Sequence, residues 1–100
     1  MDYNHCMIRN FKCPETEKIS QGYQSLKFPI SIQKKALDKL LQIKSSEQIS
    51  DLRVPPGNRL EKLKGERASQ FSIRINDQWR ICFEWENDEA IDVEIVDYHR

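Results

Sequence analysis

The second half of the chain alternates between apolar and polar residues with a period of two. The alternation is clearest in residues 70–76, 79–85 and 91–95, where isoleucine, valine, phenylalanine and tryptophan recur at every second position. In a β-strand this spacing places the apolar side chains on one face and the polar side chains on the other. We therefore predict three strands of a sheet with one buried face, and one further strand at residues 59–64.

The first half of the chain has the spacing of helices. Isoleucine, leucine and alanine recur at helical intervals in residues 30–43, with lysine and glutamine on the other side, and either Pro29 or Ser31 begins this helix. Residues 15–23 can form about two further helical turns. Two prolines and a Gly-Asn pair disfavour both helix and strand in residues 50–58, which we predict to be a loop.

Length and composition indicate one domain of the α+β class. One hundred residues are too few for two cores, and a hydrophobic fraction of 38% is typical of a compact protein. Residues 1–6 show no periodicity, so we expect an N-terminal extension there and a single domain at residues 7–100. This domain opens with a short strand at residues 7–11, where apolar positions alternate.

The chain shows neither a membrane span nor a secretion signal. No apolar run approaches the ~18 residues that cross a bilayer, and the N-terminus lacks a charged-then-apolar pattern. We expect a cytoplasmic protein without a membrane partner, whose three cysteines are reduced. The cysteines form no CxxC pair, so we expect neither a metal nor another cofactor.

Charge is balanced overall but divided along the chain. The formal net charge is zero. Residues 59–80 nevertheless contain six basic and three acidic side chains, whereas residues 81–100 contain one basic and seven acidic side chains. This asymmetry is typical of a protein that binds a polyanion with one surface, and it is equally compatible with charges that serve solubility alone.

Strand register predicts two arginines side by side. A three-residue turn at residues 76–78 keeps the apolar residues of both flanking strands on one face, and it places Arg74 opposite Arg80 on the other face. Like charges directly opposite in a ladder are unfavourable by roughly a few tenths of a kcal/mol. Either the two guanidiniums bind a phosphate, or Arg80 forms a solvated ion pair with Glu84.

The last four residues bring together an acid, a phenol, an imidazole and a guanidinium. Asp97, Tyr98, His99 and Arg100 follow directly after the alternating segment 91–96. Chain ends commonly fray and carry no function. The alternative is that the last strand anchors a reactive cluster in a particular place.

Several of these segments together resemble a known family. The sequence NRLEKLKGER at residues 58–67, FSIRINDQWRICF at residues 71–83 and DYH at residues 97–99 are similar, in this order and spacing, to the HigB family of toxins from toxin–antitoxin systems, within the RelE/ParE superfamily. The stretch PPGNRLE at residues 55–61 is similar to the subgroup that contains the toxin GraT. The resemblance covers about residues 7–99, and it implies two helices packed on one face of a small, twisted, mainly antiparallel sheet.

The resemblance implies a toxin that arrests translation. Proteins of this family are ribosome-dependent endoribonucleases that cut mRNA in the decoding site. A helix-turn-helix antitoxin similar to HigA neutralises the toxin, and operator DNA is contacted only indirectly, through the antitoxin. The balanced net charge agrees with dependence on the ribosome, because a free nuclease attracts RNA by long-range electrostatics.

Cleavage of RNA by its own 2′-hydroxyl requires a base, cations for the phosphorane and an acid for the leaving 5′-oxygen, but no metal. Asp97, Tyr98 and His99 match the family's terminal catalytic cluster. We expect His99 to transfer a proton because the unperturbed pKa of histidine lies near neutrality. Asp97 would orient it or act as the base, and Tyr98 would stack on a nucleobase or donate a proton. Lys64 and Arg80 match the lysine of the LKG motif and the arginine of the WRI motif, which would stabilise the phosphate.

One predicted catalytic residue departs from the family. Glu61 stands where relatives with the motif LHPLKG carry a histidine that is implicated in catalysis. A glutamate can act as a base, but it is an acid of similar strength only if burial raises its pKa. Arg59, Arg67 and Arg74 are predicted to hold the RNA backbone, with plain surface charge as the alternative for Arg67 and Arg74.

Two other functions stay open at this point. A gyrase poison of the ParE kind would share the fold without nuclease chemistry, and the terminal cluster argues against it. A degenerate, non-catalytic toxin fold would bind only the antitoxin and its operator complex.

Overall fold

The computed structural model describes residues 8–98 of the chain. Two α-helices come first, α1 (Pro14–Ser20) and α2 (Ile30–Ser45), and the strands follow, β1 (Glu61–Lys62), β2 (Gln70–Arg74), β3 (Trp79–Glu86) and β4 (Glu89–Asp97). These strands form an antiparallel sheet in the order β1-β2-β3-β4. The predicted α+β class is confirmed, whereas the predicted extension at residues 1–6 lies outside the described residues.

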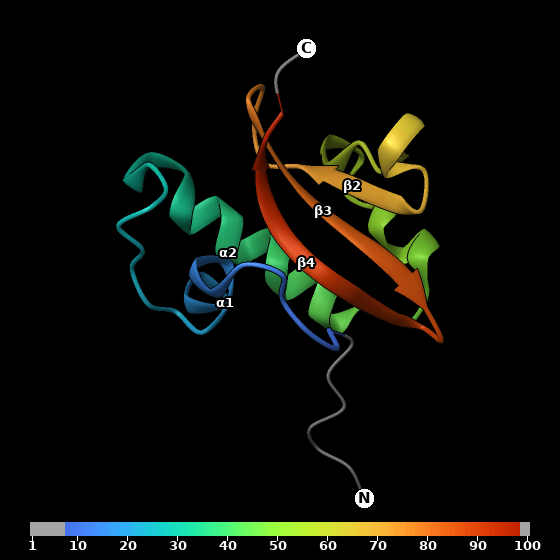
Figure 1. Cartoon of the computed structure of the whole chain (residues 1–100), viewed down its shortest axis with the longest axis horizontal. Helices are drawn as coiled ribbons and strands as arrows, with labels where there is room; N and C mark the ends of the chain where they lie inside the picture. The colour runs from blue at the N-terminus through green and yellow to red at the C-terminus, as the bar shows by residue number, and fades with distance from the viewer. Residues whose placement is uncertain (1–7, 99–100) are drawn as a thin grey trace, which may run out of the picture.

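In Figure 1, α2 passes behind the sheet and α1 lies to the left of β4. They pack against each other, and each of them contacts β4. The core between the layers contains Ile19, Ile32, Ala36, Leu40, Ile43, Ile73, Ile75, Ile81, Phe83 and Val93. Burial of a large apolar side chain stabilises a fold by about 1.5–3 kcal/mol, so the face that carries these residues is the face that the helices cover.

The helix boundaries follow from local chemistry. Helix α1 ends at Ser20 rather than at the predicted residue 23, because Gly22 takes a φ of 90° and the N–H of Tyr23 bonds to the carbonyl of Lys18 at 2.9 Å. Helix α2 begins directly after Pro29, which is its N-cap residue, so Ser31 does not begin the helix. Among residues 8–98, no helix is long and apolar enough to span a bilayer.

The segment before α1 runs beside β4 without forming the predicted regular strand. It joins β4 through two isolated parallel bridges, Ile8 with Ala90 and Phe11 with Val93. Between them, Asp92 takes a φ of 54°, and its N–H donates to the side-chain oxygen of Asn10 at 3.0 Å. The Asn10 amide in turn donates to the Asp92 carboxylate at 2.7 Å. Because side-chain bonds replace ladder bonds here, the pairing stays irregular.

The segment between α2 and β2 contains three 3-10 helices, η1 (Ile49–Arg53), η2 (Pro56–Asn58) and η3 (Gly65–Arg67). The predicted strand at residues 59–64 is therefore wrong except at Glu61–Lys62. The left-handed conformation of Arg59, with a φ of 47°, ends η2 and turns the chain before a strand can begin. Likewise Gly65, with a φ of 67°, turns the chain into η3.

Asn58 holds this segment against α2. Its side chain is completely buried, accepts a hydrogen bond from the ammonium group of Lys39, and donates to the Gln42 side chain at 2.9 Å and to the Leu52 carbonyl at 3.1 Å. A buried amide that meets its hydrogen-bonding capacity in this way fixes its backbone. Arg59, the next residue, is therefore held in a defined place.

The predicted register between β2 and β3 is confirmed. Arg74 is the partner of Arg80, and the N–H of Ile75 donates to the carbonyl of Trp79 at 2.8 Å, which closes the turn at residues 76–78. Trp79 packs against the core and meets the ring of Phe28 edge-on, with centroids 5.7 Å apart. The parity of the strands thus places both arginines on the face away from the helices.

Candidate functional site

The face of the sheet that the helices leave uncovered carries polar side chains in two rows. One row runs across the strands through Glu61, Ser72, Cys82 and Glu94. The next row contains Arg74 and Arg80, followed by Val96. Strand pairing therefore brings acids and arginines from four strands onto one small surface.

Arg80 is buried in this surface, with 8% of its area exposed. Its Nε donates to the hydroxyl of Ser72 at 2.7 Å, and its Nη2 donates to the carbonyl of Arg59 at 2.7 Å. Its guanidinium also forms an ion pair with the Glu61 carboxylate at 3.3 Å. An arginine with these partners is oriented by the protein before any ligand arrives.

The alternative ion pair between Arg80 and Glu84 is wrong. Glu84 is the cross-strand partner of Gln70, at the other end of β2, and its carboxylate accepts a hydrogen bond from Ser69 at 3.3 Å. Arg80 extends instead toward the segment that follows η2, where Glu61 and the Arg59 carbonyl lie. The predicted exposure of Arg80 is wrong as well, because that segment covers its side chain.

Three arginines meet at a pocket of about 300 Å³. Its lining consists of Arg59, Arg74, Asn76, Asp77, Arg80 and Tyr98. Arg74 forms an ion pair with the exposed Asp77, and the guanidinium carbon of Arg80 lies 5.8 Å from the centroid of the Tyr98 ring. Guanidiniums that converge on one hollow suit a phosphate group, which they bind through pairs of N–H donors.

A second hollow of about 550 Å³ adjoins the first. Arg59 and Arg80 line both hollows, and the second is completed by Pro56, Leu60 and Glu61. Its walls offer two apolar side chains and one carboxylate. The two hollows together form a continuous surface with Arg59 and Arg80 between them, which we call the arginine site.

The last described residues are anchored beside this site. Asp97 pairs with Trp79 at the end of the β3–β4 ladder, and its carboxylate accepts a hydrogen bond from the Gln78 side chain at 3.1 Å. The N–H of Tyr98 donates to the Gln78 carbonyl at 2.7 Å. This end of the sheet lies at the top of Figure 1, where β4 ends beside the start of β3. His99 lies outside the described residues.

Two predicted site residues lie apart from the pocket. Lys64 is exposed at the start of η3 and is not part of the lining. Arg67 donates to the Gln70 side chain at 2.7 Å and forms an ion pair with Glu94 at 3.5 Å, so its charge is directed toward the middle of the sheet. Of the predicted residues, the structure gathers Arg59, Glu61, Arg74, Arg80 and Tyr98 around the arginine site. Asp97 is outside both linings and pairs with Trp79, whose side chain packs against the core on the helix-covered face.

Strand pairing places Ser72 and Cys82 on this face, and no sequence motif marked either of them as functional. Ser72 is completely buried and binds Arg80, a contact that only the pairing of β2 with β3 reveals. Burial raises the pKa of the Cys82 thiol to about 11, so this thiol is protonated near neutral pH. Within residues 8–98, histidine, cysteine and acidic side chains form no group that could hold a metal ion.

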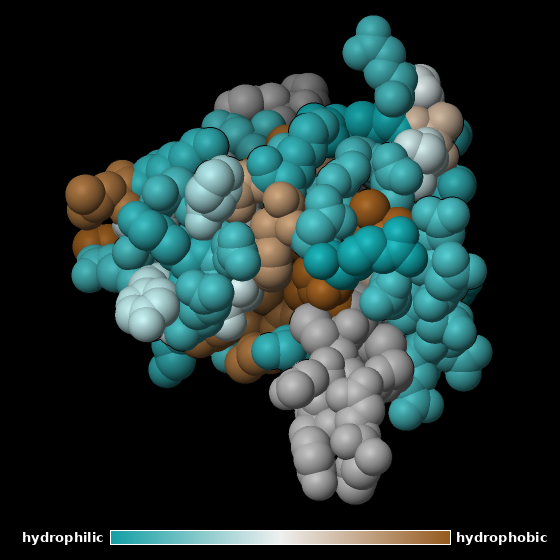
Figure 2. Space-filling view, turned by 60° about the horizontal axis from the view of Figure 1, so that its bottom comes forward, coloured by the Kyte–Doolittle hydropathy of each residue, from teal (hydrophilic) through white to brown (hydrophobic). Residues whose placement is uncertain are grey.

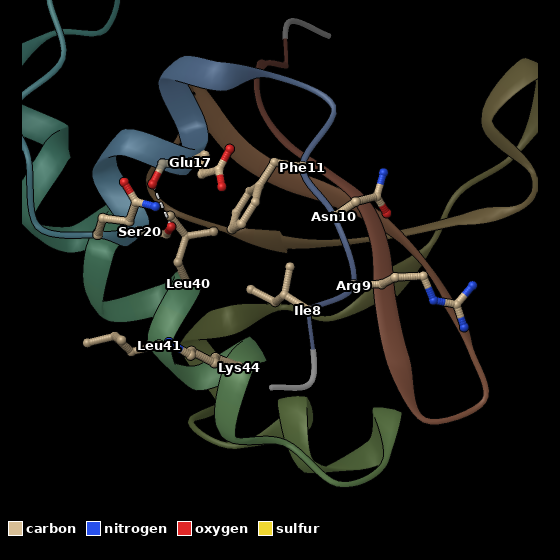
Figure 3. A pocket seen from close by; sticks show the side chains of 10 residues that line it. Ile8, Arg9, Asn10, Phe11, Glu17, Ser20, Leu40, Leu41 and Lys44 are labelled. Carbon is tan, nitrogen blue, oxygen red and sulfur yellow. Dashed lines mark hydrogen bonds between the residues drawn. The ribbon is translucent and has the colours of Figure 1, made fainter. Parts of the chain in front are cut away.

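A separate hollow of about 510 Å³ lies on the helical side of the molecule, between the segment before α1 and the two helices. Figure 2 shows apolar side chains at the floor of a depression that polar side chains surround. In Figure 3 the side chains of Ile8, Phe11 and Leu40 point toward one another across it. Its polar groups come from residues such as Glu17 and Lys44 and include no cluster of arginines. The charged chemistry is therefore concentrated at the arginine site.

Comparison with known proteins gives consistent results. A family model described as the RelE-like toxin of type II toxin–antitoxin system HigB matches residues 5–99. A protein of Vibrio cholerae named toxin HigB-1 is 39% identical over 72 residues, which are 72% of this chain and 75% of the relative. A protein of Proteus vulgaris named endoribonuclease HigB is 28% identical over 93 residues, which are 93% of this chain and all of the relative. An uncharacterized protein of Haemophilus influenzae is 43% identical over 64 residues, 64% of this chain and 63% of the relative.

Proposed function

Because this chain belongs to the HigB-like toxins, which are RelE-like toxins of type II toxin–antitoxin systems, we propose that it is a metal-independent endoribonuclease that cuts mRNA on the ribosome and so arrests translation. The observation that carries the proposal is the convergence of Arg59, Arg74 and Arg80 with Tyr98 on one pocket. The name of the Proteus vulgaris relative, an endoribonuclease, agrees with it.

The proposed reaction uses the RNA's own 2′-hydroxyl. Its oxygen attacks the adjacent phosphorus as a carboxylate, Asp97 or Glu61, takes its proton. The bond from phosphorus to the 5′-oxygen then breaks, and His99 protonates that oxygen, which leaves a 2′,3′-cyclic phosphate. Arg80 stabilises the charge that develops on the phosphorane, because its guanidinium is already oriented. No metal is needed, since the side chains supply the base, the acid and the cations.

The remaining cations have supporting roles. Arg74 and Arg59 bind the scissile phosphate or its neighbour in the pocket, while Lys64 and Arg67 contact the RNA backbone outside it. Tyr98 stacks on a nucleobase beside Arg80. The cation–π contact of its ring with Arg80, at 5.8 Å, supports this placement.

The ribosome and an antitoxin complete the proposal. A net charge of zero gives little long-range attraction for free RNA, so the ribosome would present the message to the arginine site. A type II toxin has an antitoxin partner, which we propose to be a helix-turn-helix protein of the HigA kind. Operator DNA would then be contacted only through that antitoxin.

A purified translation system tests the proposal. Primer extension should reveal new 5′ ends in the message when the protein and ribosomes are both present, and an intact message when ribosomes are omitted. Chelation of free divalent ions after ribosome assembly is not a usable control, because ribosomes themselves require magnesium. Inhibited translation with an intact message would refute the nuclease and favour the non-catalytic binding protein.

A truncation tests the role of the terminal cluster. A chain that ends at Tyr98 should lose toxicity but retain its fold and antitoxin binding, because the core residues of β4 end at Ile95. A chain that ends at His99 is the matched control, and it should stay toxic. Colony formation, circular dichroism and antitoxin co-purification measure the three properties. Full toxicity of the shorter chain would place the proton transfer elsewhere.

A further inference from the structure

Ser72 is a completely buried polar residue in the middle of β2. Its side chain lies beside Arg80 of the neighbouring strand, and the Arg80 Nε donates to the Ser72 hydroxyl at 2.7 Å. Serine is not a residue that strands favour, and an apolar residue would fill the same space. We therefore look for the role of this hydroxyl in its bonding partner, Arg80.

The bond to Nε has a geometric consequence for Arg80. A guanidinium is planar, so hydrogen bonds to two of its nitrogens fix both its position and the orientation of its plane. Ser72 accepts from Nε, and the Arg59 carbonyl accepts from Nη2, also at 2.7 Å. The Ser72 carbonyl adds a longer contact with Nη2 at 3.4 Å. Two segments that are distant in sequence thus hold one guanidinium from two directions.

The Ser72 contact is specific to Arg80 among the arginines of the pocket. Arg74 bonds to the exposed Asp77 within its own turn, and it is 30% exposed along its side chain. The Arg59 side chain extends from the backbone segment that follows η2. Neither arrangement places a buried hydroxyl beneath the guanidinium. Arg80 is consequently the cation that the fold orients most strictly.

We propose that Ser72 is a positioning residue, whose hydroxyl sets the orientation in which Arg80 meets the scissile phosphate. This inference rests on the proposed ribonuclease function. A displacement of a reacting group by about 1 Å can lower a rate about 100-fold. Removal of the hydroxyl leaves Nε without this acceptor in a buried place, so the guanidinium moves toward Glu61 and water and away from its productive orientation.

The test measures the single-turnover cleavage of mRNA on purified ribosomes as a function of ribosome concentration. Ser72→Ala should lower the maximal rate about 10- to 100-fold, with the half-saturating ribosome concentration unchanged, because the contacts that bind the ribosome are intact. Ser72→Thr keeps the acceptor oxygen and should restore most of the rate. Ser69→Ala is the matched control, since it removes a serine hydroxyl that bonds to the exposed carboxylate of Glu84 and should leave the rate unchanged.

A double-mutant cycle distinguishes positioning from an independent effect. If Ser72 acts through Arg80, Ser72→Ala should lower the rate no further in a chain that already carries Arg80→Ala. An equal loss in both backgrounds would overturn the proposal. So would a loss that disappears at a temperature at which the Ser72→Ala chain is fully folded.

A spectroscopic measurement tests the same geometry without activity. In the ¹⁵N-labelled protein, the Nε–H of Arg80 should exchange slowly with water. Ser72→Ala should make that exchange at least ten times faster, whereas Ser69→Ala should leave its rate unchanged. Unaltered exchange would overturn the inference. A wild-type protein that leaves the message intact would instead remove the proposed function, and the positioning role would fail together with it. A wild-type protein that cuts, with a Ser72→Ala variant that cuts equally fast, would overturn the positioning role alone.

Discussion

Replacement of Arg80 with alanine is predicted to destabilise the protein substantially. The change removes the donors to the Ser72 hydroxyl and to the Arg59 carbonyl, both at 2.7 Å, from an environment in which Arg80 is 8% exposed. Hydrogen bonds that involve a charged group contribute about 1.5–3 kcal/mol each when buried, and water that enters the vacated space recovers part of the loss. We take about 2–4 kcal/mol for the two bonds together.

The ion pair with Glu61 adds little to this sum. The Glu61 side chain is 45% exposed, and pairs with one exposed partner contribute about 0–1 kcal/mol. In a domain of this size each kcal/mol shifts the melting temperature by about 4–8 °C. Arg80→Ala should therefore lower the melting temperature by roughly 10–30 °C.

The assay is urea denaturation followed by circular dichroism, with Arg74→Ala as the matched control. Arg74 is the cross-strand neighbour of Arg80, but its ion-pair partner Asp77 is 99% exposed along its side chain, so its removal should change the unfolding free energy by less than about 1 kcal/mol. Both variants should cut mRNA more slowly than the wild type. Equal unfolding midpoints for Arg80→Ala and Arg74→Ala would refute the reasoning, because the buried hydrogen bonds would then contribute nothing that an exposed pair does not.

Four further predictions concern three residues around the arginine site. Arg59→Gly should leave the unfolding free energy unchanged or raise it by up to about 1 kcal/mol, because glycine adopts the φ of 47° without strain and keeps the carbonyl that binds Arg80. The rate of mRNA cleavage should fall at the same time. Urea denaturation and primer extension measure the two effects, and a clear destabilisation would contradict this prediction. Asn58→Ala should destabilise the protein by about 2–4 kcal/mol, since the side chain is completely buried and its loss leaves the Lys39 ammonium without this acceptor; an unfolding midpoint within error of the wild type would contradict it. Burial raises the pKa of the Cys82 thiol from 9.0 to about 11, whereas the effect of burial at Cys13 is outweighed by hydrogen bonds at Thr16, so the pKa of Cys13 is lowered. At pH 8 the Cys82 thiol should therefore be alkylated far more slowly than the Cys13 thiol. Mass spectrometry of iodoacetamide-treated protein resolves the two sites, and equal rates would be inconsistent with a buried Cys82 thiol. Because the folded pKa of Cys82 exceeds the unfolded value, its contribution to stability should be present below pH 9 and be lost as the pH rises through about 11.

The strand register was accessible from the sequence because it depends on local parity. An apolar residue at every second position leaves a single turn length that keeps both flanking strands consistent, and that turn places Arg74 opposite Arg80. The helix at Ile30–Ser45 was predictable for a similar reason, since its apolar spacing extends over several turns. Helix ends were harder to predict where the conformation of a single residue sets them, as Gly22 does at the end of α1.

The strand predicted at residues 59–64 failed for a reason outside its own pattern. The segment is held by Asn58, whose partners come from α2 and from η1, and Arg59 then takes a left-handed conformation. The alternating pattern of residues 59–64 does not predict those contacts. Tertiary hydrogen bonds thus outweighed local propensity.

The residues of the polar face of β2 and β3 were predictable, but their arrangement was not. The sequence by itself determined which residues belong to the polar face, because side-chain direction in a strand follows from position alone. Only the tertiary structure decided that Arg80 is buried, that it pairs with Glu61 rather than Glu84, and that Ser72 orients it. The physical reason is that these contacts join residues separated by 8 to 21 positions on different elements, so they exist only after the segment that follows η2 has folded across the end of the sheet.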